Sequence, residues 1–293
     1  MAHSLLLFSF FIGINYIIFL NGLITNHFYT WLQLNGYHED DFPSLIFGNN
    51  GSFGGKDTEK SIIKKRPVIF IHGNGDGALD DGSLLGSGWN SSLNTFLNNG
   101  YTMKELYGIT WGDRIMENNL SRTFDCKYVK KIRRFILAVL KYTKFNSINI
   151  VSHSMGVTLT RKAIKGGAIK EKHDVCNIGE PISKKINTFN GYWPGNDYGY
   201  DECGIKSKNE GRQNNYSNFL QNLNEDKYLE GQYIINIFST QDEVIGNNNI
   251  VFNKNTSRLS TITEQFISDK WSHIETKDKS SSYVIEMIKK YDD

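Results

Sequence analysis

Apolar runs suited to buried β-strands alternate along this chain with segments whose apolar residues recur at helical spacing, and no other feature restricts the fold as much. The runs that predict strands cover 66–73, 101–112, 147–153, 186–192 and 232–240, and those that predict helices cover 91–100, 125–145, 155–167 and 281–293. Strands and helices in alternation favour a mostly parallel sheet with helices on both faces. No linker or repeat interrupts this order, so the sequence predicts a single α/β domain over 23–293.

The first 22 residues differ from this pattern. The stretch from Leu5 to Gly22 is almost wholly apolar and carries no charged side chain. It predicts a secretory signal peptide over 1–22, cleaved near Gly22. The alternative is an uncleaved signal anchor that tethers the protein to a membrane, because the run is nearly long enough to span a bilayer. We therefore expect a secreted protein, with membrane tethering as the alternative.

Sequons and cysteines agree with secretion. Sequons for N-glycosylation occur, in polar sequence, at Asn50, Asn90, Asn119, Asn215 and Asn255. The three cysteines fit no zinc site and predict one disulfide and one spare thiol. We expect the disulfide between Cys176 and Cys203, which flank the same loop-rich insert, and this leaves Cys126 without a partner.

Charge and glycine patterns bear on binding partners. The formal net charge is +2, and the 33 Lys and Arg residues are spread along the chain, which argues against a nucleic acid partner. The glycine-rich "HGNGDG" (72–77) lacks the G-x-G-x-x-G pattern and no G-K-[ST] follows, so nucleotide binding is disfavoured and no cofactor or metal is expected.

The segment "INIVSHSMGV" (148–157) places a serine where a buried strand turns into a helix. That turn lies at the carboxyl edge of a parallel sheet, and it is so tight that residues two positions on either side must be small. Ser152 and Gly156 meet this condition, with serine in place of the first glycine of G-x-S-x-G. Ser154 could instead be an ordinary N-cap residue. Further motifs favour a nucleophile.

An oxyanion hole is the second requirement of acyl transfer, because negative charge develops on the former carbonyl oxygen. One expected donor is the backbone N–H of Met155, the residue that follows the serine. The loop "FIHGNGDG" (70–77) follows an earlier strand, and we assign the second donor to the N–H of Asn74. His72 is expected to support the loop through hydrogen bonds rather than to act in catalysis.

A serine nucleophile also needs a histidine base and a carboxylate, which follow it in the order Ser, acid, His. Only His153, His173 and His273 can be considered on position. His153 adjoins the serine in a tight turn, and His173 precedes every later strand. His273, in a polar loop before the last helix, is the expected base. Asp242 is the first carboxylate after the strand 232–240, with Glu243 as its neighbour and competitor.

With these residues in place, the chain resembles the class 2 lipase family, in particular its secreted nematode-type branch. The similarity runs from about Gly51 to the C-terminus and is carried by "VIFIHGNGDGAL", "GYTMKELYGITWGD", "CKYVKKIRRFILAVLKYT", "INIVSHSMGVTLTRKAIKGG", "SNFLQNLN" and "STQDEVIG". It implies an α/β-hydrolase fold, action on lipid esters, the triad Ser154, Asp242 and His273, and oxyanion donors at Asn74 and Met155. The branch tends to carry more cysteines, so its disulfides and substrate range do not transfer directly.

The predicted function is that of a triacylglycerol lipase working through an acyl-enzyme. The expected partners are a lipid or other ester substrate and, transiently, a lipid interface, with no stable protein partner inferred. A short-chain carboxylesterase or thioesterase would share every motif. A secreted lipid-binding protein without turnover is the alternative outside enzymes.

Overall fold

An eight-stranded sheet forms the centre of the computed structural model, which describes residues 23–83, 86–119, 121–170, 174–192, 218–245, 249–251, 254–255, 257 and 261–292. Its strands, in spatial order, are β1 (Leu23–Ile24), β2 (Ser52–Gly54), β4 (Leu106–Ile109), β3 (Val68–Ile71), β5 (Ile148–His153), β8 (Ile186–Tyr192), β9 (Tyr233–Ser239) and β12 (Glu264–Ser268). Every neighbouring pair is parallel except β2 with β4. The predicted α/β fold with a mostly parallel sheet is confirmed.

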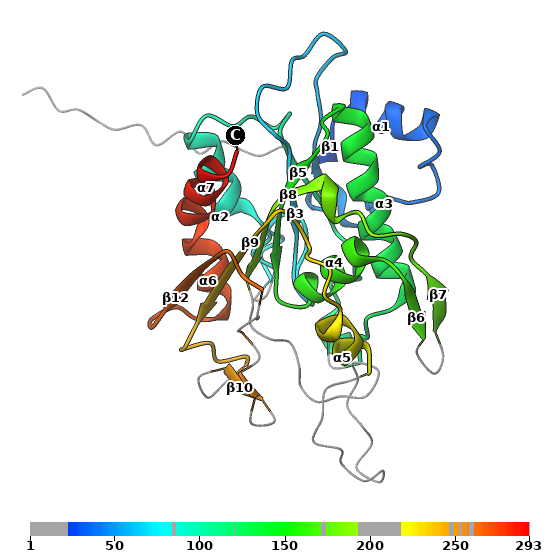
Figure 1. Cartoon of the computed structure of the whole chain (residues 1–293). Coiled ribbons are helices and arrows are strands. Elements are labelled where there is room, and N and C mark those ends of the chain that lie inside the picture. The colour runs from blue at the N-terminus through cyan, green and yellow to red at the C-terminus, as the bar shows by residue number, and fades with distance from the viewer. Residues whose placement is uncertain are drawn as a thin grey trace, which may run out of the picture.

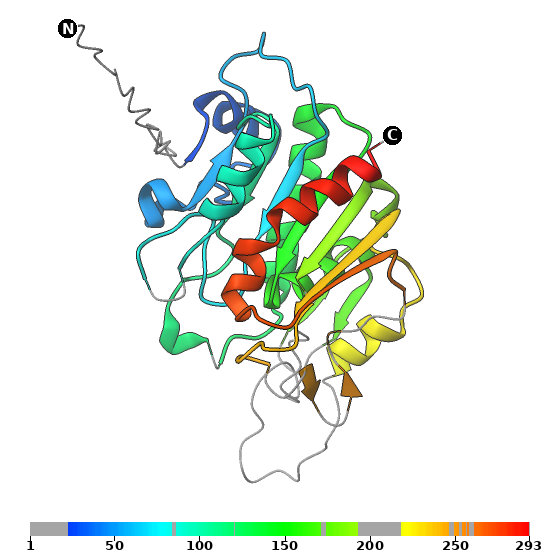
Figure 2. The ribbon, with the colours of Figure 1, turned by 90° about the vertical axis from the view of Figure 1, so that its left-hand side faces the viewer.

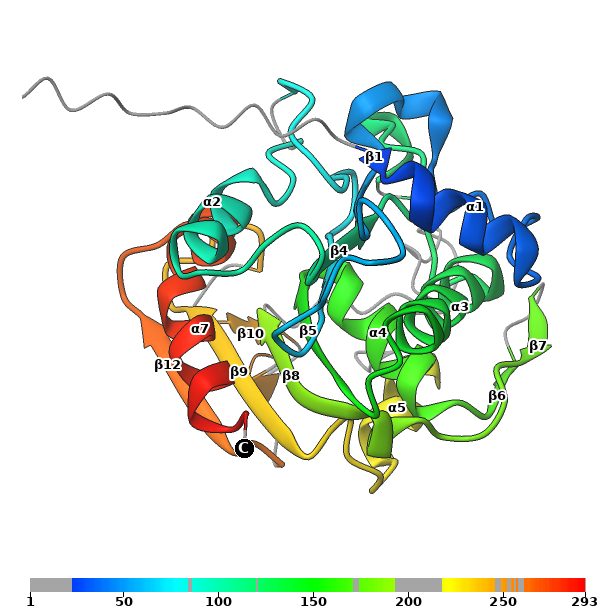
Figure 3. The same ribbon diagram turned by 90° about the horizontal axis from the view of Figure 1, so that it is seen from above.

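Helices cover both faces of the sheet, as Figures 1 and 3 show. One face carries α1 (Asn26–Leu34), α3 (Cys126–Thr143), α4 (Met155–Lys165) and α5 (Asn218–Glu225). The other carries α2 (Asn90–Asn98), α6 (His273–Lys279) and α7 (Ser281–Lys290) (Figure 2). Each layer encloses its own cluster of buried apolar side chains.

The remaining elements are short. They are the 3₁₀ helices η1 (Leu45–Asn50), η2 (Met116–Asn118) and η3 (Ser183–Lys185), and the strand pairs β6 (Ala168–Lys170) with β7 (Val175–Asn177) and β10 (Ile250–Val251) with β11 (Lys254–Asn255). No helix within the described ranges has both the length and the apolar composition needed to cross a bilayer. The predicted leader, 1–22, lies outside those ranges.

Helix α3 shows how the apolar pattern determines packing. Its predicted stripe of five aliphatic residues is buried throughout, and it consists of Val129, Ile132, Ile136, Val139 and Leu140. Such a stripe drives the helix onto the sheet because burying each large aliphatic side chain contributes roughly 1.5–3 kcal/mol. On the opposite face Lys127 and Lys130 are exposed, whereas Lys131 is half-buried and donates to Ser44 Oγ at 3.2 Å.

The strand assignments differ from expectation at two places near β4. The glycine-rich stretch 48–60, for which no strand was predicted, contains the buried strand β2. Gly54 there has φ +110°, and a Cβ at this position would come within 2.2 Å of the Leu106 carbonyl oxygen. The glycine is needed for close contact between strands. The strand expected over 101–112 is shorter, because residues 103–105 form a turn before β4.

The predicted disulfide is wrong. Cys176 is bonded to Cys126, 50 residues earlier, and Cys203 lies outside the described residues. The bond ties the hairpin β6–β7 to the first residue of α3, whose backbone N–H also donates to the Asp174 carboxylate at 2.5 Å. Cys126 and Cys176 are distant in sequence, and only the folding of α3 and α4 against each other brings them together.

Removing this bond should lower the free energy of unfolding. Replacing both Cys126 and Cys176 by serine frees a loop of 50 residues in the unfolded chain, and we expect a loss of about 2–4 kcal/mol. Urea unfolding of the double variant measures it. Cys203→Ser is the control and should leave the bond intact. A peptide containing Cys176 linked to Cys203 in the native protein would contradict the pairing.

Candidate active site

Ser154 lies on a strained turn between β5 and α4. Its backbone has φ +52° and ψ −132°, a region that side-chain-bearing residues rarely adopt. Gly156 permits the turn, because a Cβ there would lie 2.1 Å from the His72 carbonyl oxygen. Ser152 stands in place of the first glycine of the G-x-S-x-G pattern. Its side chain fits because its Oγ donates to Thr160 Oγ1 at 3.2 Å. This geometry differs from that of an ordinary N-cap, whose backbone is extended, and matches the sharp strand-to-helix turn expected for a nucleophile.

Asp242 and His273 form a buried pair at the same edge of the sheet. His273 Nδ1 lies 2.8 Å from Asp242 Oδ2, and both residues are less than a tenth exposed. Asp242 Oδ1 accepts hydrogen bonds from the N–H groups of Val244 and Ile245, at 3.0 and 2.9 Å. The carboxylate is therefore fixed by the loop after β9, and it holds the imidazole through Nδ1, which leaves Nε2 for another partner.

Glu243, the competing carboxylate, binds a different part of the same residue. Its Oε2 accepts the backbone N–H of His273 at 2.9 Å. His273 does not lie in a loop as expected but is the first residue of α6. The helix begins there because Ser272 is its N-cap and forms a capping box with Glu275. Glu243 thus adds to the helix cap while Asp242 holds the ring.

The loop after β3 passes directly against Ser154. A Cβ on Gly73 would lie 2.8 Å from Ser154 Cβ, so only glycine fits. His72 supports the loop as expected. Its Nδ1 donates to the Gly73 carbonyl at 2.7 Å, its Nε2 accepts the Trp111 N–H at 3.0 Å, and burial lowers the pKa of His72 to about 3. The neutral ring is locked in one tautomer beneath the turn.

The side chain of Asn74 is held away from its own backbone. Its Nδ2 donates to the Asn119 carbonyl at 2.8 Å, and its Oδ1 accepts from Arg122, which also pairs with Asp113. Asn119, one of the predicted sequons, also accepts from Arg122 through its own side chain at 2.8 Å. Met155 is the first residue of α4, so its N–H has no intrahelical acceptor. Met155 directly follows Ser154, and Asn74 directly follows Gly73, which packs against Ser154, so both stay predicted oxyanion donors.

His153 is a site residue whose contacts the sequence did not reveal. Its ring centroid lies 4.6 Å from that of His273, and its Nε2 donates to the His273 carbonyl at 3.2 Å. Burial lowers the pKa of His153 well below its usual value. The residue next to the serine thus brings the start of α6 up to the elbow. The remaining candidate, His173, lies outside the described residues.

Two buried neutral histidines should make the protein sensitive to acid. His72 and His153 bind a proton in the unfolded chain near pH 6.5 but resist it when folded. Their contribution is complete above pH 6.5 and is lost as the pH falls toward the folded values. From pH 7 to pH 5 each should cost roughly 2 kcal/mol of unfolding free energy. Burial raises the pKa of Asp76, and the effect of this carboxyl on stability has the opposite sign.

Urea unfolding at the two pH values measures the effect. His153→Asn keeps a donor but does not titrate in this range, and we expect it to remove about half of the pH dependence. Equal stability of the native protein at pH 7 and pH 5 would contradict the prediction.

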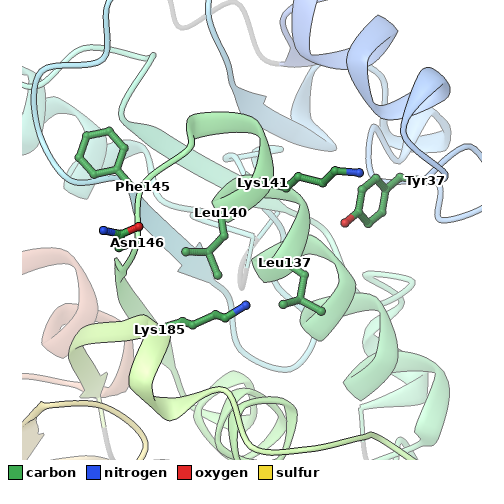
Figure 4. Close-up of a pocket in the computed structure, with 7 residues that line it drawn as sticks. All are labelled: Tyr37, Leu137, Leu140, Lys141, Phe145, Asn146 and Lys185. Atoms are coloured by element: carbon green, nitrogen blue, oxygen red, sulfur yellow. The ribbon is translucent and has the colours of Figure 1, made fainter.

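A surface cavity of about 450 Å³ lies away from this site (Figure 4). It is lined by Tyr37, Leu137, Leu140, Lys141, Phe145, Asn146 and Lys185. Residues 145–146 precede β5 and Ser154 follows it, so the cavity opens at the opposite end of the strand. The described residues contain no group of three or more His, Cys, Asp or Glu side chains arranged to hold a metal.

A serine on a strained turn after a central parallel strand, in a sheet of this order, defines an α/β hydrolase. The sequence model of class 2 lipases matches residues 65–286, and the chain belongs to that family. It is a carboxylic ester hydrolase. No curated protein matches the sequence.

The solved structures that match this chain are distant in sequence. A monoacylglycerol lipase from Paleococcus ferrophilus is 10% identical, with a TM-score of 0.46 and coverage of 83% of this chain and 98% of the other. The carboxylesterase CesB from Bacillus subtilis is 8% identical, with a TM-score of 0.45 and coverage of 90% and 96%. An acylaminoacyl peptidase from Pyrococcus horikoshii is 15% identical, with a TM-score of 0.47, and this chain covers 39% of its length while 82% of this chain is aligned.

Proposed function

We propose that the protein is a secreted lipase of the nematode-type branch, and that it hydrolyses triacylglycerols through Ser154, His273 and Asp242. The observation that carries the proposal is the buried contact between His273 Nδ1 and Asp242 Oδ2, at the sheet edge where Ser154 occupies a strained turn. Because Asp242 occupies Nδ1, the neutral ring presents Nε2 as a base. A serine, an oriented base and adjacent N–H donors are the parts that acyl transfer needs.

In this mechanism His273 takes the proton of Ser154 as the hydroxyl attacks the ester carbonyl. The N–H groups of Asn74 and Met155 stabilise the negative charge of the tetrahedral intermediate. His273 then protonates the leaving alcohol, and water hydrolyses the acyl-enzyme by the same route. Asp242 stabilises the imidazolium that forms at each step. This mechanism needs no cofactor or metal.

The proposed lipid substrate is supported by exposed apolar side chains on the loops that leave the carboxyl edge. Ile115 and Met116 follow β4, and Val244 follows β9 two residues after Asp242. Exposed apolar side chains around a site favour contact with an apolar surface. The proposal therefore includes transient docking at a lipid interface.

Secretion is supported by the apolar leader and by the Cys126–Cys176 bond, because disulfides persist in oxidising compartments. The sequons at Asn50 and Asn90 lie at partly exposed positions, consistent with glycosylation.

Hydrolysis of a p-nitrophenyl ester series from acetate to palmitate, together with a triacylglycerol emulsion, tests the proposal. A hydrolysis rate that rises with acyl-chain length, together with hydrolysis of the emulsion, supports a lipase. Activity confined to acetate and butyrate would make the protein a short-chain esterase. No activity on any ester and no reaction with a serine-directed phosphonate would leave a lipid-binding protein.

A further inference from the structure

A lysine without access to solvent lies one helical turn beyond His273. Lys277 is fully buried, and its Nζ donates to Ser87 Oγ at 2.9 Å and to the Gly88 carbonyl. Positions four apart face the same side of a helix, so Lys277 and His273 lie on one face of α6. The ammonium thus joins the helix that carries the proposed base to the loop 86–88 that precedes α2.

The loop 86–88 also binds a buried carboxylate, that of Asp76, which belongs to the loop 70–77 that carries the proposed oxyanion donor Asn74. Asp76, two residues after Asn74, is 3% exposed, and its Oδ1 accepts the N–H groups of Gly77 and Gly88 at 2.8 and 2.9 Å. Its Oδ2 has no hydrogen-bond partner among the described residues and lies 3.9 Å from Lys277 Nζ. Asp278 also contacts the ammonium, at 2.7 Å, but it belongs to α6 itself and connects no second element.

The stability of the fold does not by itself explain this pair. Removing an ammonium from water costs several kcal/mol, and an apolar side chain of similar size often stabilises a core as well or better. A buried pair of charges does fix which two elements lie together, because a shifted arrangement leaves a charge without its partner. Here the two elements carry the proposed base and a proposed oxyanion donor.

We propose that Asp76 and Lys277 form a buried ion pair that sets the position of His273 relative to the oxyanion loop, which makes both of them positioning residues of the proposed hydrolysis. The inference rests on the proposed function. The attacking oxygen, the base and the oxyanion donors must be aligned at once, and a displacement of about 1 Å can cost roughly 10²-fold in rate. Binding of the acyl chain does not depend on this alignment.

The test measures kcat and KM of Lys277→Met, with the concentration of working sites determined by phosphonate titration. We expect kcat per titrated site to fall by about 10- to 100-fold while KM stays within about threefold. Lys277→Arg keeps the charge and should recover most of the lost kcat. Asp76→Asn keeps its two backbone hydrogen bonds and the shape of the side chain, so it gives the same measurement if Lys277→Met does not fold.

Lys165→Met is the matched control. Lys165 is also a buried lysine, contacting the Asp226 and Tyr228 carbonyls at the far end of α4, about 15 Å along the helix from Ser154. It should lose stability without losing kcat per titrated site. The double variant Asp76→Asn with Lys277→Met, which leaves no unpaired charge, should regain stability but keep a low kcat.

Two outcomes would overturn the proposal. One is a normal kcat per titrated site in Lys277→Met and Asp76→Asn, and the other is recovery of kcat together with stability in the double variant. Failure of the proposed function is distinguishable, because the native protein would then neither be titrated by the phosphonate nor hydrolyse esters.

Discussion

Replacing Ser154 by alanine should lower kcat on ester substrates by about 10⁴-fold or more. In the proposed mechanism the hydroxyl forms the acyl-enzyme, so the chemical step has no substitute nucleophile. The proposed oxyanion donors at Asn74 and Met155 are backbone groups and survive the change. We therefore expect a small residual rate above that in water, and no reaction of the variant with a serine-directed phosphonate. Mass spectrometry of the labelled protein and the p-nitrophenyl series measure the two effects.

The strained backbone of Ser154 supplies a control for this variant. Alanine meets the same strain at φ +52° as serine, so the free energy of unfolding should stay within about 1 kcal/mol of the native value. Glycine tolerates this conformation, and Ser154→Gly should be more stable than Ser154→Ala by about 1–3 kcal/mol. Phosphonate labelling that persists in Ser154→Ala would mean that another residue is the nucleophile.

Local patterns sufficed to predict the central strands and helices. β3, β5 and β9 are mostly apolar runs bounded by polar or glycine residues, and α3 has an unbroken apolar stripe. Strand β2 was not predicted, because its three residues form a strand only through pairing with β1 and β4. The edge strand β12 was also missed, since its five residues alternate half-buried and exposed positions and only the last, Ser268, is buried.

In the proposed site, too, local sequence patterns identified some of the residues and missed others. The order of serine, carboxylate and histidine identified residues that the fold brings to one edge, because strand ends and their loops are fixed by the sheet. The Cys126–Cys176 bond and the Asp76–Lys277 pair involve residues from elements far apart in sequence, and nothing local indicates such contacts. A lysine at position 277 reads as a surface residue until the packing of α6 on α2 is known.

The choice between Asp242 and Glu243 leads to a sharp contrast between two conservative variants. In Asp242→Asn the amide oxygen can keep the N–H groups of Val244 and Ile245, so the amide nitrogen faces His273 Nδ1. That nitrogen is a donor, and it favours the tautomer with the proton on Nε2, which cannot accept the serine proton. We expect kcat to fall on the order of 10⁴-fold with the fold intact.

Glu243→Gln should change kcat by less than about threefold, because its amide oxygen still accepts the His273 N–H. Only the negative charge near the start of α6 is lost, and this should cost about 0.3–1 kcal/mol of unfolding free energy. Both variants are compared by kcat per phosphonate-titrated site over a range of pH. A larger loss in Glu243→Gln than in Asp242→Asn would reassign the carboxylate to Glu243, and equal small losses would mean that neither carboxylate orients the base. The 2.8 Å contact of Asp242 with the ring, against the backbone contact of Glu243, is the reason to expect the first variant to be the damaging one.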